Sequence, residues 1–216
     1  MTKNLSKRIF TSIILFSILL IGLFLNEYTW LILLIIASIL SFFEFNCLVN
    51  KIWKKKEYYK YYFKIIFFFY LLLFIFSGNL LYKQGLELTL FILFVCIFSD
   101  MGGYIIGKTI GGKKLTKISP NKTISGGLGS LLFSTIPIFI FSIYNSYEYP
   151  ITFYIIILTL LTSLTCQIGD LLISYFKRKA KVKDTGSLLP GHGGVLDRVD
   201  GILLALPFGL LLLLLR

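Results

Sequence analysis

The sequence predicts an all-α polytopic integral membrane protein with about seven transmembrane helices. Two features of the composition favour this fold class: 56% of the 216 residues are hydrophobic, and the mean hydropathy is +0.84. The third observation is the length of the apolar runs, several of which approach the roughly 20 residues that a helix needs to cross the hydrocarbon core of a bilayer.

Seven apolar runs justify the predicted helices in chain order. The first run resembles the hydrophobic part of a signal peptide, but no small-residue cleavage site follows it, because Asn26, Glu27 and Tyr28 come next. We therefore expect a retained helix there. The third and seventh runs are short, and we expect them to tilt less or to pack inside the bundle. The predicted spans are about 9–25, 29–49, 64–82, 86–106, 126–145, 151–173 and 200–215.

The distribution of cations predicts the orientation of these spans. Twenty of the 22 Lys and Arg residues lie at the N-terminus or in the segments 50–64, 107–125 and 177–199, and seven alternating spans place all of these on one side. By the positive-inside rule that side is cytoplasmic. We expect a bacterial-type inner membrane, with the active site facing the cytoplasm. The net charge of +12 therefore indicates topology and attraction to anionic lipid. We expect no nucleic-acid partner, because no soluble basic domain remains to bind one.

Acidic side chains also stand within or beside the apolar runs, where ionisable groups are costly and usually functional. Asp100, Asp170 and Glu44 lie near the cytoplasmic ends of the fourth, sixth and second runs, and Asp197 and Asp200 flank the start of the seventh. Carboxylates from four helices are thus expected at one depth, beneath the basic loops. For Asp100 and Asp170 the alternative is a buried ion pair with a loop lysine. Glu44 is equally compatible with a site role and with a helix-packing hydrogen bond.

Asp197 and Asp200 are three residues apart, so on a helix they share a face. Either one alone is compatible with a favourable charge at a helix N-terminus. Together with Asp100 and Asp170 at a matching depth, the pair indicates a divalent metal. Mg²⁺ prefers oxygen ligands and is typically held by one or two carboxylates plus substrate phosphates. We therefore expect Mg²⁺ and leave open a second, monovalent or divalent, cation.

Glycines gather in two cytoplasmic stretches, with 13 of the 18 in 102–129 and 186–201. Glycine lets backbone N–H groups approach an anion closely. His192, the only histidine, stands in the second stretch and is either a general base or ligand, or a loop residue that only forms hydrogen bonds. Cations for phosphate, carboxylates for metal and glycines for close approach together indicate chemistry on a phosphorylated substrate at a membrane surface.

The stretch from Ser174 to Asp200 carries a motif of fixed spacing: Ser, two residues, Lys-Arg, four residues, Lys-Asp, and later Pro-Gly-His-Gly-Gly, an apolar pair and Asp-Arg-x-Asp. In this motif the chain resembles the phosphatidate cytidylyltransferase family, also called CDP-diacylglycerol synthases. The matching residues are Ser174, Lys177, Arg178, Lys183, Asp184, Pro190, Gly191, His192, Gly193, Gly194, Asp197, Arg198 and Asp200. The upstream residues that resemble other motifs of the family are Gly169-Asp170, Ser99-Asp100, Gly103-Tyr104, Ser119-Pro120, Lys122-Thr123 and Gly126.

The chain departs from the family's pattern at two positions of the upstream loop. Ser125 stands where the family usually has an acidic residue, and Asn121 stands where a lysine is common. The chain is also short for the family, and we expect that it lacks one or two N-terminal spans. The motifs cover about a third of the chain, and the remainder agrees in hydropathy.

The resemblance implies transfer of a cytidylyl group from CTP to phosphatidate, which gives CDP-diacylglycerol and pyrophosphate. It implies a single membrane-embedded domain over 1–216, with its signature region at 167–201 and its loop motif at 99–129. Membrane lipid is an expected partner, and a homodimer is left open. The implied Mg²⁺ ligands are Asp170, Asp197 and Asp100, with Asp200 as a further ligand or support. The other implied catalytic and substrate-binding residues are Lys183, Asp184, Ser174, Lys177, Arg178, Arg198, His192, Ser119, Lys122 and Thr123.

Two alternative functions use similar residues. A CTP-dependent lipid kinase would transfer the γ-phosphoryl group instead, and the formation of CDP rather than pyrophosphate distinguishes it. An ion-coupled transporter also places acids within a helix bundle. It predicts polar residues through both leaflets, whereas the outer half of these runs is nearly all apolar.

Overall fold

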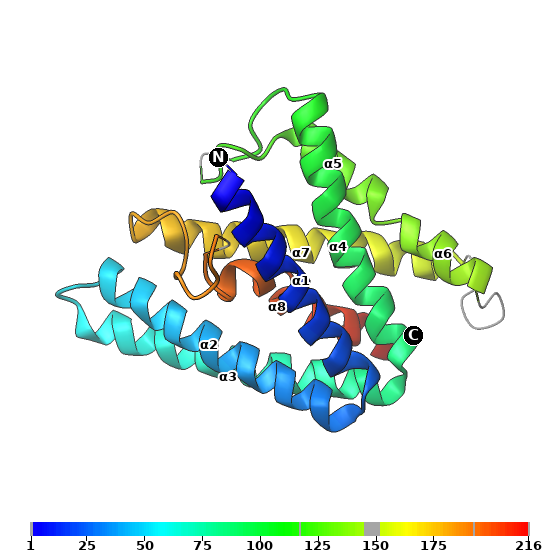
Figure 1. The fold of residues 1–216 in the computed structure, drawn as a ribbon, viewed down its shortest axis with the longest axis horizontal. Helices are drawn as coiled ribbons and strands as arrows, with labels where there is room; N and C mark the ends of the chain where they lie inside the picture. Colours follow the sequence, from blue (N-terminus) through cyan, green and yellow to red (C-terminus); the bar gives the residue numbers. More distant parts are fainter. Residues whose placement is uncertain (1, 117, 145–151, 192, 216) are drawn as a thin grey trace. The chain divides into compact units, whose positions relative to one another are not determined.

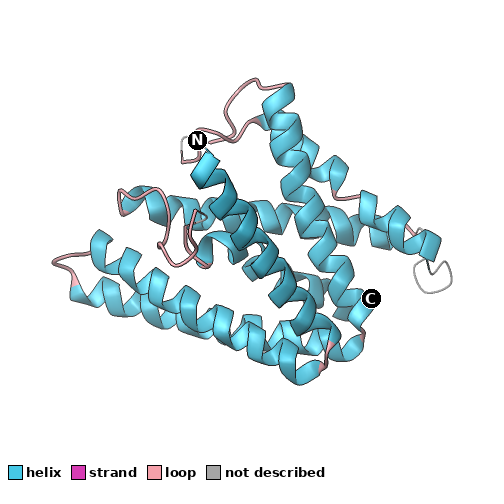
Figure 2. Ribbon diagram, in the orientation of Figure 1, coloured by secondary structure: helices cyan, strands magenta, loops and turns pink. Residues whose placement is uncertain are grey.

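The computed structural model describes residues 2–116, 118–144, 152–191 and 193–215 (Figure 1). These residues form eight α-helices. Figure 2 shows helices and loops without a strand, which confirms the all-α prediction. The helices are α1 (Thr2–Phe24), α2 (Glu27–Ile52), α3 (Glu57–Gln84), α4 (Leu86–Thr109), α5 (Ile124–Phe133), α6 (Ile136–Tyr144), α7 (Phe153–Lys179) and α8 (Leu196–Leu214).

Within the described residues, five helical segments are long and apolar enough to cross a membrane, so the chain is an integral membrane protein. The apolar part of α1, Phe10–Phe24, is shorter. Those five segments are α2, α3, α4, Ile124–Ile143 and α7. The count of seven spans and their orientation stay predictions.

The predicted run 126–145 is not one continuous helix, because α5 ends at Phe133 and α6 begins at Ile136. Pro137 gives a physical reason for the interruption. Proline has no N–H to donate, and its ring clashes with the carbonyl four residues earlier in a helix. Ser134 and Thr135 fill the break, and their hydroxyls donate to the carbonyls of Leu131 and Leu132 at 2.7 Å each.

Two helix boundaries beside the signature region differ from the predicted ones. α7 continues past residue 173 to Lys179, so Ser174 and Lys177 project from a helix. α8 begins at Leu196, which places Asp197 and Asp200 on one helix, as expected. The polar residues just outside both predicted runs are thus helical. Backbone hydrogen bonding continues there although the side chains are no longer apolar.

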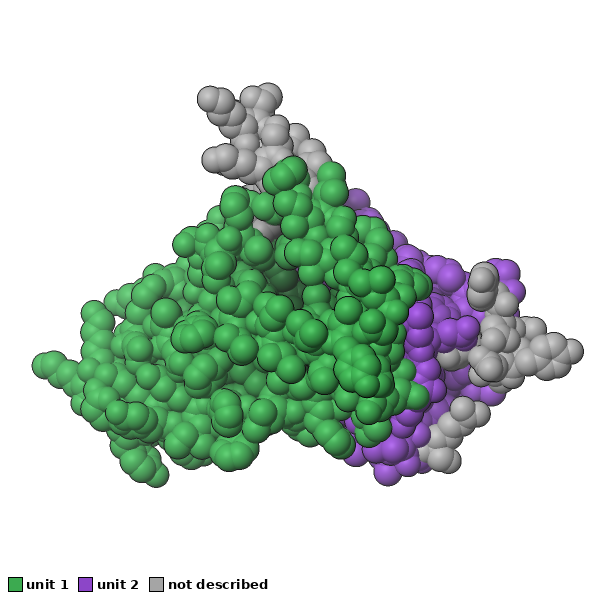
Figure 3. Space-filling model, turned by 60° about the horizontal axis from the view of Figure 1, so that its bottom comes forward, with its two compact units in different colours: residues 1–83, 175–200 green, residues 84–174, 201–216 purple. Residues whose placement is uncertain are grey.

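The chain divides into two compact units (Figure 3). The first unit contains Met1–Lys83 and Tyr175–Asp200, and the second contains Gln84–Ser174 and Gly201–Arg216. α7 and α8 each contribute residues to both units. The expected single domain over the whole chain stays a prediction.

In the first unit, aromatic side chains join the helices. Trp30 on α2 is buried, and its indole N–H donates to the carbonyl of Gly78 on α3 at 2.9 Å. Nearer the signature region, Phe45 stacks on Phe67 with ring centroids 4.0 Å apart and meets Phe176 of α7 edge to face at 5.0 Å. These contacts fix the part of α2 that carries Glu44.

In the second unit, α4 and α5 approach closely through glycines. A Cβ atom on Gly129 would lie 2.5 Å from the Cβ of Ile106, and one on Gly126 would lie 2.8 Å from the carbonyl oxygen of Gly103. Only the absence of a side chain allows this separation. Ser99 of α4 also bonds Ser163 of α7 at 2.8 Å. Residues of α4, α5 and α7 line a cavity.

Candidate active site

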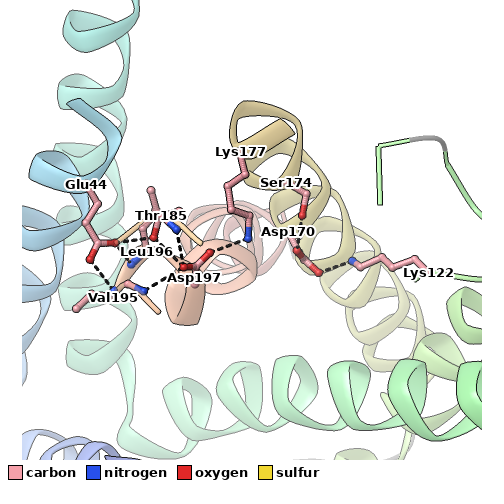
Figure 4. Close-up of polar contacts among 10 residues, drawn as sticks. Glu44, Lys122, Asp170, Ser174, Lys177, Thr185, Val195, Leu196 and Asp197 are labelled. Carbon is pink, nitrogen blue, oxygen red and sulfur yellow. Dashed lines mark hydrogen bonds and ion pairs between the residues drawn. The ribbon is translucent and has the colours of Figure 1, made fainter. Parts of the chain in front are cut away.

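Asp197, in the first turn of α8, is the centre of a polar network in the first unit (Figure 4). Its Oδ1 accepts a hydrogen bond from Lys177 Nζ at 2.7 Å. Its Oδ2 accepts from the backbone N–H groups of Thr185 at 2.8 Å and Gly194 at 3.1 Å. Only 7% of the Asp197 side chain is exposed, so nearly all of its hydrogen bonding is with protein.

The electrostatics of Asp197 follow from these partners. The carboxyl lies before the predicted seventh span, in the polar first turn of α8. Burial alone would raise its pKa, but the bonds from Lys177, Thr185 and Gly194 outweigh that effect and hold the pKa below its ordinary value. Asp197 is therefore a carboxylate at neutral pH, in a fixed orientation.

Glu44 on α2 belongs to the same network. Its Oε1 accepts from the backbone N–H of Val195 at 2.9 Å, and its Oε2 accepts from that of Leu196 at 2.9 Å. The hydroxyl of Thr185 donates to Glu44 Oε2 at 2.7 Å. Sequence reasoning left Glu44 between two roles and did not single out Thr185, whose small polar side chain carries no local signal of burial.

A polar cavity of about 540 Å³ opens in the loop of the first unit. Lys183, Asp184 and Arg198 line it, so the structure brings three of the predicted site residues together there. Gly191 and Gly193 have φ of 80° and 85°, a backbone conformation that residues with a Cβ rarely adopt. These two glycines shape the loop that presents the cations.

Asp170 on α7 anchors a separate group in the second unit (Figure 4). It forms an ion pair with Lys122 and accepts a hydrogen bond from Ser174 Oγ at 3.2 Å. The Asp170 side chain is 29% exposed and that of Lys122 is 28% exposed. Asp170 therefore pairs with a loop lysine, as the alternative left open for it expected, but both side chains are partly exposed rather than buried. Asp100 lines the same cavity as both residues.

This second cavity has a volume of about 330 Å³ and contains most of the upstream loop motif. Thr123 caps α5 by accepting from the N–H of Gly126 at 3.0 Å, which holds the loop against the helix. The predicted site residues that line the cavity are Asp100, Ser119, Lys122, Thr123 and Asp170.

Gln167 also lines this cavity, and sequence reasoning missed it. Its Nε2 is buried and has no hydrogen-bond partner in the described part of the chain. A buried amide donor without a partner is unfavourable unless a ligand supplies an acceptor. The available signal was a polar residue inside an apolar run, three positions before Asp170.

Two of the remaining predicted residues, Arg178 and Asp200, belong to the first unit. Arg178 is exposed near the end of α7, and Asp200 is half-buried in the first turns of α8. His192 lies outside the described residues. Asp197 belongs to the first unit and Asp170 to the second, so the expected sharing of one ion by these two carboxylates stays a prediction.

The donor set of the second cavity is compatible with magnesium. Among the described residues no group of three or more His, Cys, Asp or Glu side chains is arranged to hold a metal without other ligands. Asp100 and Asp170 nevertheless line one cavity, and Mg²⁺ usually takes one or two carboxylates and completes its shell with phosphate and water oxygens. The pair therefore fits an ion that takes its other ligands from phosphate and water oxygens.

Comparison with known proteins places these residues in a family. The model of the cytidylyltransferase family matches residues 47–215, which include both cavities. A phosphatidate cytidylyltransferase of Rickettsia bellii is 47% identical over 126 residues, which are 55% of this chain and 54% of the relative. The Bacillus subtilis protein of that name is 40% identical over 122 residues, which are 55% of this chain and 45% of the relative. The chain spans about half the length of the curated relatives it matches.

Proposed function

The chain belongs to the cytidylyltransferase family, and from this premise we propose that it transfers a cytidylyl group from CTP to phosphatidate. The observation that carries the proposal is the family match over residues 47–215, joined by relatives of 40–47% identity that are named phosphatidate cytidylyltransferase. The products are CDP-diacylglycerol and pyrophosphate.

In this reaction a phosphate oxygen of phosphatidate attacks the α-phosphorus of CTP. The new P–O bond forms as the bond from the α-phosphorus to the oxygen bridging to the β-phosphorus breaks, and pyrophosphate leaves with that oxygen. The nucleophile is already ionised, so no residue has to remove a proton from it. The protein's task is to position two anions and to neutralise their charge.

The cavity of the second unit is the proposed nucleotide site. Lys122 supplies a positive charge, and the backbone of Gly126 and Gly127 allows close approach of an anion. Asp100 and Asp170 would hold Mg²⁺, which when bound neutralises phosphate oxygens and assists departure of pyrophosphate. A triphosphate that attracts Lys122 would compete with Asp170 for this lysine.

The loop of the first unit is the proposed second phosphate-binding region. Lys183 and Arg198 line its cavity with Asp184, while Lys177 is held by Asp197. Arg178 and Asp200 are proposed to bind substrate together with Lys183 and Arg198. Ser174 supports Asp170 by donating its hydroxyl.

The proposed topology has seven spans, a cytoplasmic N-terminus and the basic loops on the cytoplasmic face of a bacterial inner membrane. Single cysteines at Lys55 and Ser187, in a background without Cys47, Cys96 and Cys166, should react only with a reagent that enters the cytoplasm. A cysteine at Lys83 should react from outside. Labelling of position 187 from outside intact cells would overturn this orientation.

The decisive assay uses CTP labelled either at the α- or at the γ-phosphorus, with phosphatidate in detergent micelles. Cytidylyl transfer moves the α-label into lipid and the γ-label into pyrophosphate. A lipid kinase would move the γ-label into lipid and release CDP. Label that stays in CTP with phosphatidate and Mg²⁺ present would overturn the proposal.

A further inference from the structure

Glu44 is a buried residue, and within the described part of the chain its carboxylate accepts hydrogen bonds from the signature region. Its side chain is 5% exposed, and its three donors are the N–H groups of Val195 and Leu196 and the hydroxyl of Thr185 (Figure 4). These donors lie 141 to 152 positions away in the sequence. The interaction is therefore tertiary, and it is specific to the loop that precedes α8.

Two glycines of the loop make room for this carboxylate. A Cβ on Gly186 would lie 2.7 Å from Glu44 Oε1, and a Cβ on Gly194 would overlap both Glu44 and the Thr185 hydroxyl. Gly193 differs, because its φ of 85° already favours glycine. Gly186 and Gly194 are thus needed for space, which indicates that the loop closes around the Glu44 side chain.

The contacts of Glu44 are those of a helix cap supplied by another helix. Leu196 is the first residue of α8, and the first N–H groups of a helix have no partner within it. A carboxylate there satisfies those donors and interacts favourably with the helix dipole. The same bonds offset the cost of burying the Glu44 charge.

Thr185 connects this cap to Asp197. Its hydroxyl oxygen lies 2.7 Å from Glu44 Oε2 and 2.9 Å from Asp197 Oδ2, while its N–H donates to the same Asp197 oxygen. Asp197 in turn holds Lys177. A continuous set of contacts therefore leads from Glu44 through the Thr185 hydroxyl and the start of α8 to Asp197 and Lys177.

We propose that Glu44 is a positioning residue: by capping α8 and holding Thr185, it sets the orientation of Asp197 and thereby of Lys177. Glu44 touches no substrate in this scheme. The effect on catalysis rests on the proposed cytidylyl transfer, whereas the effect on the loop does not.

The test compares Glu44→Gln with Ser41→Ala as the matched control. Ser41 lies one turn earlier on α2, and its buried Oγ has no partner among the described residues, so removing it should leave the loop unchanged. Glu44→Gln places an amide donor where two backbone donors need acceptors. We expect kcat to fall about tenfold or more, with KM for CTP changed by less than about threefold, because transition-state orientation rather than binding is lost.

A second readout is amide hydrogen exchange of the segment 193–198 in detergent. Exchange should accelerate about tenfold in Glu44→Gln and stay unchanged in Ser41→Ala, because local opening of the α8 start becomes easier. Unchanged exchange and unchanged kcat in Glu44→Gln would overturn the proposal. If the wild-type protein transfers no cytidylyl group, the proposed function fails, while the exchange measurement still decides the role of Glu44.

Thr185 provides a test that does not depend on the folding of a Glu44 variant. Thr185→Ser keeps the hydroxyl and should retain kcat within about threefold. Thr185→Val keeps the shape of the side chain but loses the hydroxyl, and its kcat should fall about tenfold. Amide exchange of the segment 193–198 should also be faster in Thr185→Val than in Thr185→Ser. Equal kcat and equal exchange in Ser and Val variants would overturn the proposal.

Discussion

Asp197 and Asp170 present the same functional group in contrasting surroundings. Asp197 is 7% exposed and is held by one cation and two backbone N–H groups, while the single hydroxyl proton of Thr185 is donated to Glu44. Asp170 is 29% exposed, has one ion pair and one hydroxyl donor, and faces a cavity that Asp100 also lines. The first arrangement keeps a carboxylate in place, and the second leaves oxygen atoms accessible to a ligand.

The difference predicts that the two sites respond differently to mutation. Loss of a partner at Asp197 leaves a buried charge or buried donors unsatisfied, which lowers stability. Loss of a partner at Asp170 leaves the remaining charged group in contact with water in the cavity, so the main effect is on ligand binding. Mutations at Asp170 should therefore lower activity with little change in stability, whereas mutations at Asp197 should lower both.

The largest expected effect is that of removing either carboxylate. We expect Asp170→Asn and Asp197→Asn each to reduce turnover by roughly 10³ or more, as for loss of a central electrostatic element. Only Asp197→Asn should also lower the melting temperature. The measurement is steady-state kinetics over a Mg²⁺ titration, with thermal unfolding of protein that elutes as folded by gel filtration.

The double variant asks whether the two carboxylates act together. If they serve one catalytic unit, the double variant should be scarcely slower than either single one, because such residues are non-additive. Multiplied losses would show two independent roles. Near wild-type turnover in either single variant would remove that residue from the site.

The lysine partners sharpen the comparison. Lys177→Ala should raise KM and lower stability by about 3 kcal/mol, because it leaves the Asp197 charge buried without its cation. Lys122→Ala should raise KM for CTP with a much smaller loss of stability, because its pair is more exposed. Equal losses of stability in chemical denaturation would contradict the contrast between the two carboxylates.

The open character of the second cavity predicts a role for Gln167. Gln167→Leu removes the buried amide donor, and we expect KM for CTP to rise about tenfold with little change in kcat. Thr162→Val is the control, since it removes a buried hydroxyl on α7 that has no partner in the described chain and lies outside the cavity lining. An unchanged KM in Gln167→Leu would exclude a contact with the nucleotide.

The smallest expected effect is at Ser125, near the start of α5. Its hydroxyl donates to the carbonyl of Gly111 and lies 2.9 Å from the Thr123 hydroxyl. Ser125→Glu restores an acid near the helix N-terminus and should lower the Mg²⁺ concentration for half-maximal activity by about twofold to threefold. Abolished activity would mean that the loop depends on the hydroxyl.

The structure confirms those features of the fold that depend on local sequence. Apolar runs predicted the helical class and the membrane-spanning segments, because hydropathy acts segment by segment. The fixed spacing of the signature motif was enough to indicate the family that the match over 47–215 confirms. Even the break between α5 and α6 has a local cause in Pro137, which hydropathy alone does not reveal.

Only the tertiary structure decided which polar groups meet. Glu44 finds its donors more than 140 positions away, Lys122 pairs with Asp170 rather than with a neighbour, and Thr185 bridges two carboxylates. A hydrogen bond depends on distances of about 3 Å and on orientation, which helix packing sets and composition does not encode. The sequence by itself therefore determined the helical class and the family and supplied candidate site residues, while packing determined which carboxylate is held rigidly and which is open to a ligand.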